Sequence, residues 1–216
     1  MDKIIVIGGG GHAKIIINLL QKLKKYSILG YVDRADKGDI LGVGYLGNDD
    51  GLSHIKSQNP RCHAVIGVGQ VDIKNNRREI HQRLVRLGFD LPTLISPDAI
   101  VASDVKLGQG SVVIEGAIIQ PGTVIGHCAI INTGVCIDHD CRLGDFVHMA
   151  PGTVLSGGVE VGDDVMICTG AVVIQCRKIC SQCLIGAGAT VVDDLTQPGK
   201  YLGTPARIGL HEKILA

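Results

Sequence analysis

The sequence predicts a small Rossmann-like α/β domain over residues 1–90 and an all-β parallel β-helix of hexapeptide repeats over residues 91–200, followed by a C-terminal tail over residues 201–216. Three observations support this fold class. An aliphatic residue recurs at every sixth position through the second half of the chain. The first half alternates strand and helix patterns. Aromatic residues make up only 3% of the chain, which suits a core of stacked layers of Val and Ile.

The six-residue repeat runs without a slip from Ile95 to Val191. Neither the helical period of 3.6 residues nor the strand period of 2 produces a strict period of six. A period of six fits a prism in which each hexapeptide forms one short strand and one corner, and three hexapeptides complete a coil. The aliphatic positions are Ile95, Val101, Leu107, Val113, Ile119, Ile125, Ile131, Ile137, Leu143, Met149, Leu155, Val161, Ile167, Val173, Ile179, Ile185 and Val191.

A second periodicity supports the grouping of hexapeptides into coils of eighteen residues. Gly108, Gly126, Gly144 and Gly162 recur at this spacing, and Cys180 takes the next place. We expect these glycines to stack along one edge, where glycine permits backbone angles that other residues avoid. About five coils stacked at ~4.8 Å would form a rod roughly 25 Å long.

The N-terminal residues alternate strand and helix patterns, which predicts a small parallel sheet. A glycine run follows the first strand, and the second strand ends at Asp33. The expected elements are a strand over 3–7, a helix over 13–25, a strand over 28–32, a strand over 64–67 and a charged helix over about 75–87.

The glycine run contains a dinucleotide-type fingerprint. Gly8, Gly10 and Ala13 satisfy G-x-G-x-x-A, and Asp33 follows twenty residues after Ala13. Such glycines let backbone N–H groups approach a pyrophosphate at a helix N-terminus, and the acid accepts hydrogen bonds from a ribose or base. The alternative interpretation is a tight turn that closes a small α/β domain. The domain has half the size of a full dinucleotide-binding unit, which argues against NAD.

Composition narrows the function classes. The 21 basic and 21 acidic residues balance, so the sequence gives no support for a nucleic-acid footprint. No apolar run approaches the roughly 18 residues that a membrane span needs. The N-terminal residues begin a strand at once and lack a signal-peptide layout. Eight cysteines without an export signal indicate reduced thiols, so we expect a cytoplasmic protein.

The two halves together resemble the PglD/NeuD-type sugar O- and N-acyltransferases. The resemblance implies a left-handed β-helix, a homotrimer, acetyl-CoA as cosubstrate and no metal. It also implies N-acetylation of the 4-amino group of a nucleotide-linked 4-amino-4,6-dideoxy sugar in bacterial glycan synthesis. The matching segments are Ile4, Val6 through His12, Gly30–Asp33, Ile131–Thr133, Ile137–Asp140, Gly144–His148 and Gly203–Ala206.

The chemistry of the reaction points to a base and an oxyanion donor. His139 is the candidate general base, because the reference pKa of histidine lies near 6.5. Asp140 would orient its ring. Gly157 lies eighteen residues after His139, one coil further along the prism, where its backbone N–H is a plausible oxyanion donor.

The remaining site residues follow from the resemblance. It places the nucleotide sugar on the N-terminal domain, with substrate-positioning polar groups on the β-helix. Coenzyme A would occupy the groove between adjacent prisms. The implied substrate-binding residues are Gly8, Gly9, Gly10, Gly11, His12, Asp33, Asn132 and His148, and the implied cofactor-binding residues are Gly157, Thr169 and Ala187. Several relatives carry a second acid after the residue that matches Asp33, where this chain has Arg34.

Other functions remain open at this point. A sugar or sialic acid O-acetyltransferase would use the same base, and a non-catalytic trimeric nucleotide-binding scaffold would use the same fold. A zinc site of His127, His139 and His148 would require spacings other than twelve and nine. Cys180 and Cys183 form C-x-x-C, but no second pair follows, which favours small apolar fillers.

Overall fold

The computed structural model describes residues 1–72 and 76–208. Residues 209–216 of the predicted tail and Asn75 of the predicted charged helix lie outside the described residues. The chain divides into two compact units. The first unit comprises Met1–Gly69 and Asn76–Leu94, and the second comprises the described residues of Gln70–Asn75 and Ile95–Ala216.

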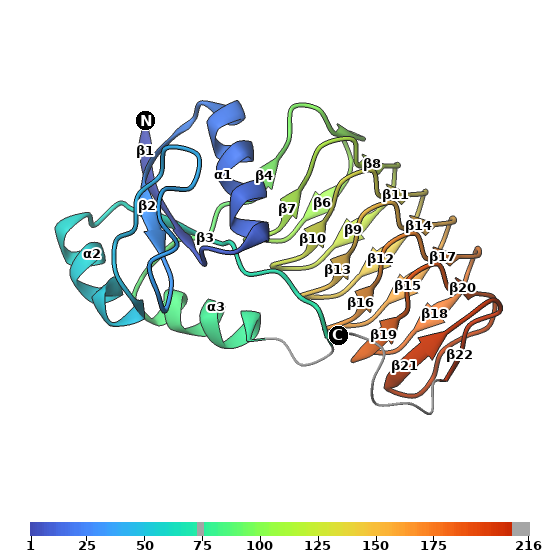
Figure 1. The fold of residues 1–216 in the computed structure, drawn as a ribbon. Helices are drawn as coiled ribbons and strands as arrows, with labels where there is room; N and C mark the ends of the chain where they lie inside the picture. Colours follow the sequence, from blue (N-terminus) through green and yellow to red (C-terminus); the bar gives the residue numbers. More distant parts are fainter. Residues whose placement is uncertain (73–75, 209–216) are drawn as a thin grey trace. The chain divides into compact units, whose positions relative to one another are not determined.

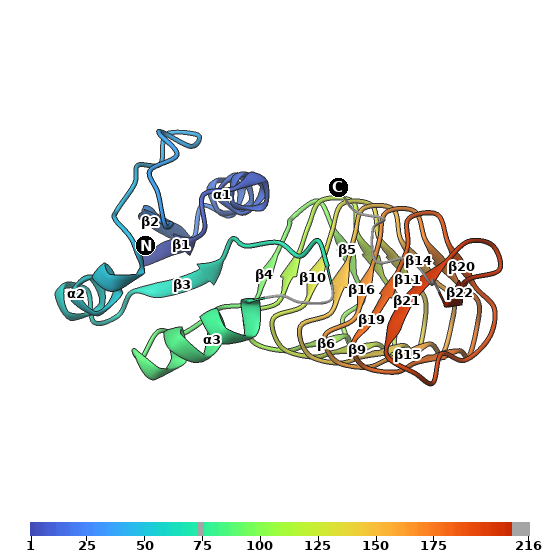
Figure 2. The ribbon, with the colours of Figure 1, turned by 60° about the horizontal axis from the view of Figure 1, so that its bottom comes forward.

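The first unit is built on a three-stranded parallel sheet with the order β2-β1-β3. Helix α1 contacts β1 and β2, and α3 contacts β3 (Figure 2). None of the helices in the described residues is both long and apolar enough to cross a membrane. The elements are β1 (Asp2–Ile7), α1 (Gly11–Leu23), β2 (Tyr26–Val32), the 3-10 helix η1 (Asp49–Gly51), α2 (Leu52–Gln58), β3 (His63–Ile66) and α3 (Arg77–Arg86).

Burial in the core of the first unit explains which of its helices and strands could be predicted from the sequence. Ile4, Ile5 and Val6 of the central strand are fully buried, as expected for a parallel strand covered on both faces. The predicted strands and helices are present within a few residues of their expected ends. Helix α2 was not predicted, because Leu52 is its only buried residue and leaves no apolar periodicity to detect.

The second unit is a parallel β-helix of stacked triangular coils (Figure 1). We name its three sheets the first, second and third faces. The first face contains β4 (Leu94–Ile95), β7 (Val112–Val113), β10 (Ile130–Ile131), β13 (His148–Met149), β16 (Met166–Ile167), β19 (Cys183–Ile185), β21 (Gly199–Leu202) and the antiparallel β22 (Arg207–Ile208). The second face contains β5 (Ile100–Val101), β8 (Ile118–Ile119), β11 (Cys136–Ile137), β14 (Val154–Leu155), β17 (Val172–Val173) and β20 (Thr190–Val191). The third face contains β6 (Lys106–Leu107), β9 (Val124–Ile125), β12 (Arg142–Leu143), β15 (Glu160–Val161) and β18 (Lys178–Ile179).

The pairing register confirms the eighteen-residue coil. Ile137 pairs with Leu155, and Leu155 with Val173, so each residue stacks on the residue one coil later. The predicted aliphatic positions point inward and are buried from Val113 to Val191. Ile95, Val101 and Leu107 are more exposed, because the first coil of this unit has a stacked coil on one side only.

The predicted glycine stack is present, but its cause differs from the prediction. Gly108, Gly126, Gly144 and Gly162 do not have positive φ angles. A methyl group at Gly126 would instead lie 2.6 Å from the carbonyl carbon of Gly144, so close approach of successive coils requires glycine there. Positive φ occurs at a different six-residue series: Gly110, Gly116, Gly122, Cys128, Gly134, Asp140, Phe146, Gly152, Gly158, Asp164, Gly170, Cys176, Gln182 and Gly188.

Candidate functional site

The strongest cluster of reactive groups lies at the second corner, between the second and third faces of the β-helix. His139 enters this corner directly after β11. Its backbone N–H donates to Oδ1 of Asp138 at 2.8 Å, and the N–H of Asp140 donates to the carbonyl of Pro121 at 3.0 Å. Asp140 takes the left-handed conformation of the series, with φ of 59°. The corner therefore holds the backbone on both sides of the histidine.

The side chains of His139 and Asp140 form the base-and-orienter pair that the sequence predicted. Nδ1 of His139 lies 2.8 Å from Oδ2 of Asp140. This hydrogen bond, followed by the negative charge of Asp138, raises the pKa of His139 above its ordinary value. When Nδ1 donates to Asp140, the lone pair on Nε2 is available to accept a proton. The ring is thus oriented and made more basic.

Gly157 lies against the other edge of the same ring. The N–H of Gly158 donates to the carbonyl of His139 at 2.9 Å, which fixes the two coils in register. A methyl group at Gly157 would lie 2.6 Å from Nε2 of His139, so any side chain at this position would displace the ring. Within residues 1–72 and 76–208, the N–H of Gly157 has no acceptor. The structure thus brings His139, Asp140 and Gly157 together.

Asn132 and His148 lie elsewhere on the same chain. Asn132 opens the first corner, between the first and second faces, and its Oδ1 accepts from the N–H of Thr133 at 2.9 Å. His148 belongs to β13 on the first face and is buried. The second face separates both residues from the His139 corner. Within one chain they are therefore not part of the His139 cluster.

The residues predicted for the cofactor divide between the same two corners. Thr169 and Ala187 are exposed at the first corner, where the N–H of Gly188 donates to the carbonyl of Thr169 at 2.9 Å. Gly157 lies at the second corner. Ala187 also borders a cavity of about 290 Å³ whose other walls include Cys168, Leu184 and Lys200.

The second face lies between these two corners and is apolar on its outer side. Its outward residues are exposed or partly exposed. Four of the five equivalent positions of the third face are instead charged, namely Lys106, Arg142, Glu160 and Lys178, and the fifth is Val124. The outward residues of the second face are Ile100, Ile118, Cys136, Val154, Val172 and Thr190. A flat apolar face of this kind on a monomer is typical of an interaction surface.

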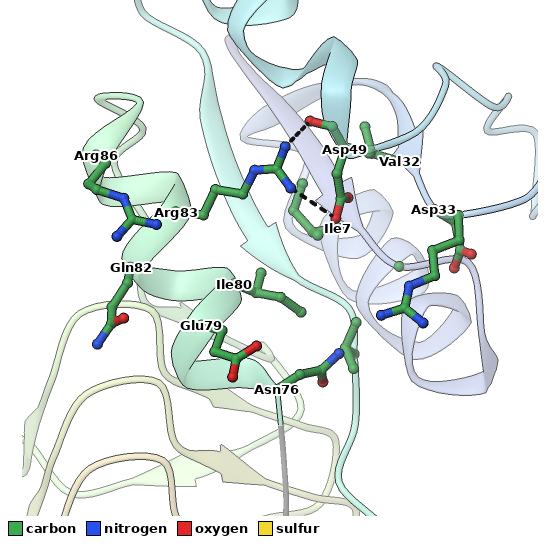
Figure 3. Close-up of a pocket in the computed structure, with 13 residues that line it drawn as sticks. Ile7, Val32, Asp33, Asp49, Asn76, Glu79, Ile80, Gln82, Arg83 and Arg86 are labelled. Carbon is green, nitrogen blue, oxygen red and sulfur yellow. Dashed lines mark hydrogen bonds and ion pairs between the residues drawn. The ribbon is translucent and has the colours of Figure 1, made fainter.

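A cavity of about 600 Å³ lies in the first unit, at the carboxyl ends of the parallel strands (Figure 3). This is where ligands bind in open α/β sheets. Its apolar walls come from Ile7, Val32, Val68 and Ile80. Its charged lining groups are Asp33, Arg34, Asp49, Glu79, Arg83 and Arg86.

Of the residues predicted for the nucleotide, Gly8 and Asp33 line this cavity. Gly8 has a φ of 108°, and Oδ2 of Asp33 accepts from the N–H of Gly9 at 2.7 Å. Gly10 is the N-cap residue of α1 and Gly11 begins the helix, and a methyl group at either would meet no atom within 4 Å. These two glycines therefore leave open space at the helix N-terminus, as an anion site requires.

His12 does not line this cavity. It is the second residue of α1, and a methyl group added at Gly69 would lie 3.4 Å from its Cβ. Burial, followed by the positive charge of Arg77, lowers the pKa of His12 to about 4. Its buried Nε2 has no hydrogen-bond partner in the described part of the chain. The ring is neutral near pH 7, so any interaction with a phosphate would be a hydrogen bond without a cationic charge.

Sequence reasoning missed the contribution of α3 to the cavity. Asn76, Glu79, Arg83 and Arg86 recur at spacings of three and four residues, which places them on one side of the helix. Arg83 is held by Asp49, through a 2.9 Å hydrogen bond to its carbonyl and a 3.5 Å ion pair to its carboxylate. The pattern that could have predicted this contribution is the three- and four-residue spacing of polar residues on a helix that follows a parallel strand.

The described residues contain no group of three or more His, Cys, Asp or Glu that could hold a metal ion. The Sγ atoms of Cys180 and Cys183 lie 3.5 Å apart. Burial, followed by the hydrogen bond to Cys180, raises the pKa of Cys183 to about 12. A thiol with this pKa is protonated and inert at neutral pH, in agreement with its interpretation as a core filler.

The comparisons with known proteins agree with this architecture. The family model described as PglD N-terminal domain matches residues 3–84. A histidine-to-asparagine variant of perosamine N-acetyltransferase from Caulobacter crescentus, solved with CoA and GDP-perosamine, is 35% identical, covers 97% of both chains and superposes with a TM-score of 0.91. The acetyltransferase domain of PglB from Neisseria gonorrhoeae FA1090, solved with acetyl coenzyme A, is 37% identical over 95% of this chain and 98% of that chain, with a TM-score of 0.88.

The curated relatives match over shorter segments. The 2,3,4,5-tetrahydropyridine-2,6-dicarboxylate N-acetyltransferase of Alkaliphilus metalliredigens is 36% identical over 122 residues, which is 53% of this chain and 52% of the relative. The match spans about half the length of the first curated relatives. The whole-chain matches to solved structures and the family model confirm the predicted resemblance. The chain belongs to the PglD/NeuD-type sugar acyltransferase family, with a small α/β domain followed by a left-handed parallel β-helix.

Proposed function

We propose that the protein is an acetyl-CoA-dependent N-acetyltransferase that acts on the 4-amino group of a nucleotide-linked 4-amino-4,6-dideoxy sugar. The observation that carries this proposal is the contact of His139 with Asp140 at 2.8 Å on one edge and with Gly157 on the other. Amine attack on a thioester needs a base and an oxyanion donor, and this corner offers both. The GDP-perosamine bound to the Caulobacter relative supports the substrate class.

We propose one task for each group at the corner. Nε2 of His139 accepts a proton from the attacking amine, while Asp140 stabilises the resulting imidazolium through Nδ1. The N–H of Gly157 donates to the oxyanion of the tetrahedral intermediate. His139 then returns the proton to the departing thiolate of coenzyme A. The direct transfer needs no covalent acetyl-enzyme.

The complete site requires a second copy of the chain, and we propose a homotrimer. Asn132, Thr169 and Ala187 border the apolar second face on one side, and His139 and Gly157 border it on the other. A neighbouring copy packed on this face would place its first corner beside the second corner of this chain. Coenzyme A would then lie between two prisms, and Asn132 and His148 would come from the neighbour.

The first unit would hold the nucleotide. Its cavity of about 600 Å³ lies in the size range of small-molecule sites, and the open N-terminus of α1 suits a diphosphate. None of the eight cysteines, all of which lie in the described residues, forms a disulfide, and this fits the expected reducing, cytoplasmic setting.

The test is turnover of acetyl-CoA with a panel of acceptors. The panel contains GDP-, UDP- and dTDP-linked 4-amino-4,6-dideoxy sugars, the free amino sugar, sialic acid and tetrahydropyridine-2,6-dicarboxylate. We expect turnover with a nucleotide-linked amino sugar and a 10²- to 10⁴-fold lower kcat in His139→Ala, with coenzyme A affinity unchanged. Turnover only with sialic acid or with the dicarboxylate would reject the proposed substrate class. Normal turnover of His139→Ala would reject the base.

A further inference from the structure

The charged groups of the 600 Å³ cavity differ in whether they are already engaged. Arg83 is held by Asp49, and Oδ2 of Asp33 is held by the N–H of Gly9. The side chains of Arg34, Glu79 and Arg86 make no hydrogen bond or ion pair with any other residue that the structure describes. Two guanidinium groups and one carboxylate are therefore available to a ligand.

We propose that this cavity selects guanine over the other nucleobases, with Arg34 and Glu79 as the residues that recognise the base. The inference rests on the proposed function, because it assumes that the first unit binds the nucleotide of the sugar substrate. It goes further by naming the base and the two side chains that read it.

The argument starts from the hydrogen-bonding edges of the bases. Guanine presents two adjacent acceptors, N7 and O6, which a guanidinium group binds with two hydrogen bonds. It also presents two adjacent donors, N1–H and the N2 amino group, which suit a carboxylate. Uracil and thymine alternate acceptors with a single donor, and adenine places an amino group beside N7. Cytosine has two adjacent acceptors, O2 and N3, but only one donor group, so guanine alone combines a pair of acceptors with a pair of donor groups.

The two residues come from different elements, so each can approach a different edge of one base. Arg34 follows the C-terminal end of β2, whereas Glu79 lies on α3, and Figure 3 shows Asp33 of the β2 end and Glu79 of α3 on opposite sides of the cavity. The side chains of Val32, Val68 and Ile80 line the same cavity and offer apolar surface for the faces of a flat ring. Gly8 lines the same cavity and leads to the open N-terminus of α1. A base in the cavity would thus direct its diphosphate towards the glycine run.

Asp33 has a different task in this arrangement. Its carboxylate accepts from the N–H of Gly9 at 2.7 Å and from the N–H of Ala35 at 3.3 Å. These contacts connect the end of β2 to the glycine run and fix the backbone from which Arg34 projects. Asp33 therefore acts as a positioning residue for both the phosphate loop and the base-reading arginine.

The experiment is calorimetric titration of the full chain with GDP, UDP, dTDP, 7-deaza-GDP and inosine diphosphate. The variants are Arg34→Met and Glu79→Gln. Arg61→Met is the matched control, because Arg61 is exposed and precedes β3, at the opposite end of the strands. 7-Deaza-GDP lacks the N7 acceptor that Arg34 would bind, and inosine diphosphate lacks the N2 amino group that Glu79 would bind.

We expect wild type and Arg61→Met to bind GDP about tenfold or more tightly than UDP or dTDP, and tighter than either analogue. Arg34→Met should bind GDP and 7-deaza-GDP with about equal affinity. In Glu79→Gln the advantage of GDP over inosine diphosphate should fall in the same way. These matched losses separate base reading from a general effect on folding, which would weaken every ligand equally.

Three results would overturn the inference. Equal affinity of wild type for GDP, UDP and dTDP would remove guanine selection. An equal loss of all nucleotides in Arg34→Met would show that Arg34 reads the phosphate or ribose. Absence of any nucleotide binding would reject both this inference and the proposal that the first unit holds the nucleotide. The first two results leave the proposed acetyltransferase function standing, so the two failures are distinguishable.

Discussion

Substitution of Gly157 by alanine tests the catalytic corner more sharply than removal of the histidine. The backbone of Gly157 does not have a positive φ angle, so alanine meets no conformational penalty there. The added methyl group would lie 2.6 Å from Nε2 and 2.7 Å from Cε1 of His139. Ordinary contacts between such atoms are about 3.5 Å or longer. The ring must therefore move by about 1 Å.

The displacement should affect catalysis much more than stability. The His139 side chain is 61% exposed, so the ring can move into solvent without disturbing the core. It would then lose the 2.8 Å hydrogen bond to Asp140 and the alignment of Nε2 with the substrate amine. A misplacement of about 1 Å costs on the order of 10²-fold in rate, or about 2.7 kcal/mol of transition-state stabilisation. We expect kcat to fall by about this factor with the melting temperature nearly unchanged.

The assay is release of the coenzyme A thiol at saturating acceptor, with thermal unfolding measured on the same samples. Gln175→Ala is the matched control, because Gln175 occupies the equivalent corner position one coil later and is exposed. Full turnover of Gly157→Ala in a folded protein would refute the arrangement of His139 against Gly157. A large drop in melting temperature would instead show that the corner is structural.

Three further predictions concern the base, the assembly and the coil stacking. Because the pKa of His139 is raised, its neutral form appears only as the pH passes that raised value, so wild-type kcat/KM should increase with pH in that range. In Asp140→Asn this increase should occur at lower pH, and the plateau of kcat/KM should fall about tenfold. An unchanged pH profile would exclude the His139–Asp140 pair. Val154→Asp on the apolar second face should convert a trimer into single chains of 22.7 kDa by light scattering, and a wild type that is already a single chain would contradict the assembly. Gly144→Ala places a methyl group 2.9 Å from the carbonyl carbon of Gly162 and should lower the free energy of unfolding by about 1–3 kcal/mol in denaturant titrations, whereas equal stability would show that the coils can separate at no cost.

Much of the fold could be predicted from the sequence, because the β-helix requires the same residue types at the same positions every six residues. The inward positions such as Ile137 and Leu155 had to be aliphatic at every layer, so the period was visible without any other information. The stacking of Gly126 on Gly144 was equally predictable, although the reason is steric contact between coils rather than positive φ. Positive φ falls at positions such as Asp140 and Phe146, where non-glycine side chains hid the pattern.

The candidate site was predictable only where it follows the coil register. The eighteen-residue spacing predicts that Gly157 stacks on His139, because stacking of successive coils is a property of one chain. The cavity of the first unit has no such period. Its lining combines the end of β2 with one side of α3, and Arg83 meets Asp49 across thirty-four positions of sequence. Contacts of this kind depend on how loops and helices pack, which no local pattern encodes.

Asn132 and His139 lie at different corners of the same chain, and this separation bears on the mechanism. In a prism of three faces, residues seven positions apart occupy successive corners and cannot converge within one chain. A resemblance that assigns both to one active site therefore implies a neighbouring prism, and the face between their corners is the apolar one. If the proposed trimer forms through the second face, we expect catalysis to depend on assembly. A substitution there, such as Val154→Asp, should abolish turnover even though the His139–Asp140 contact in each chain remains intact.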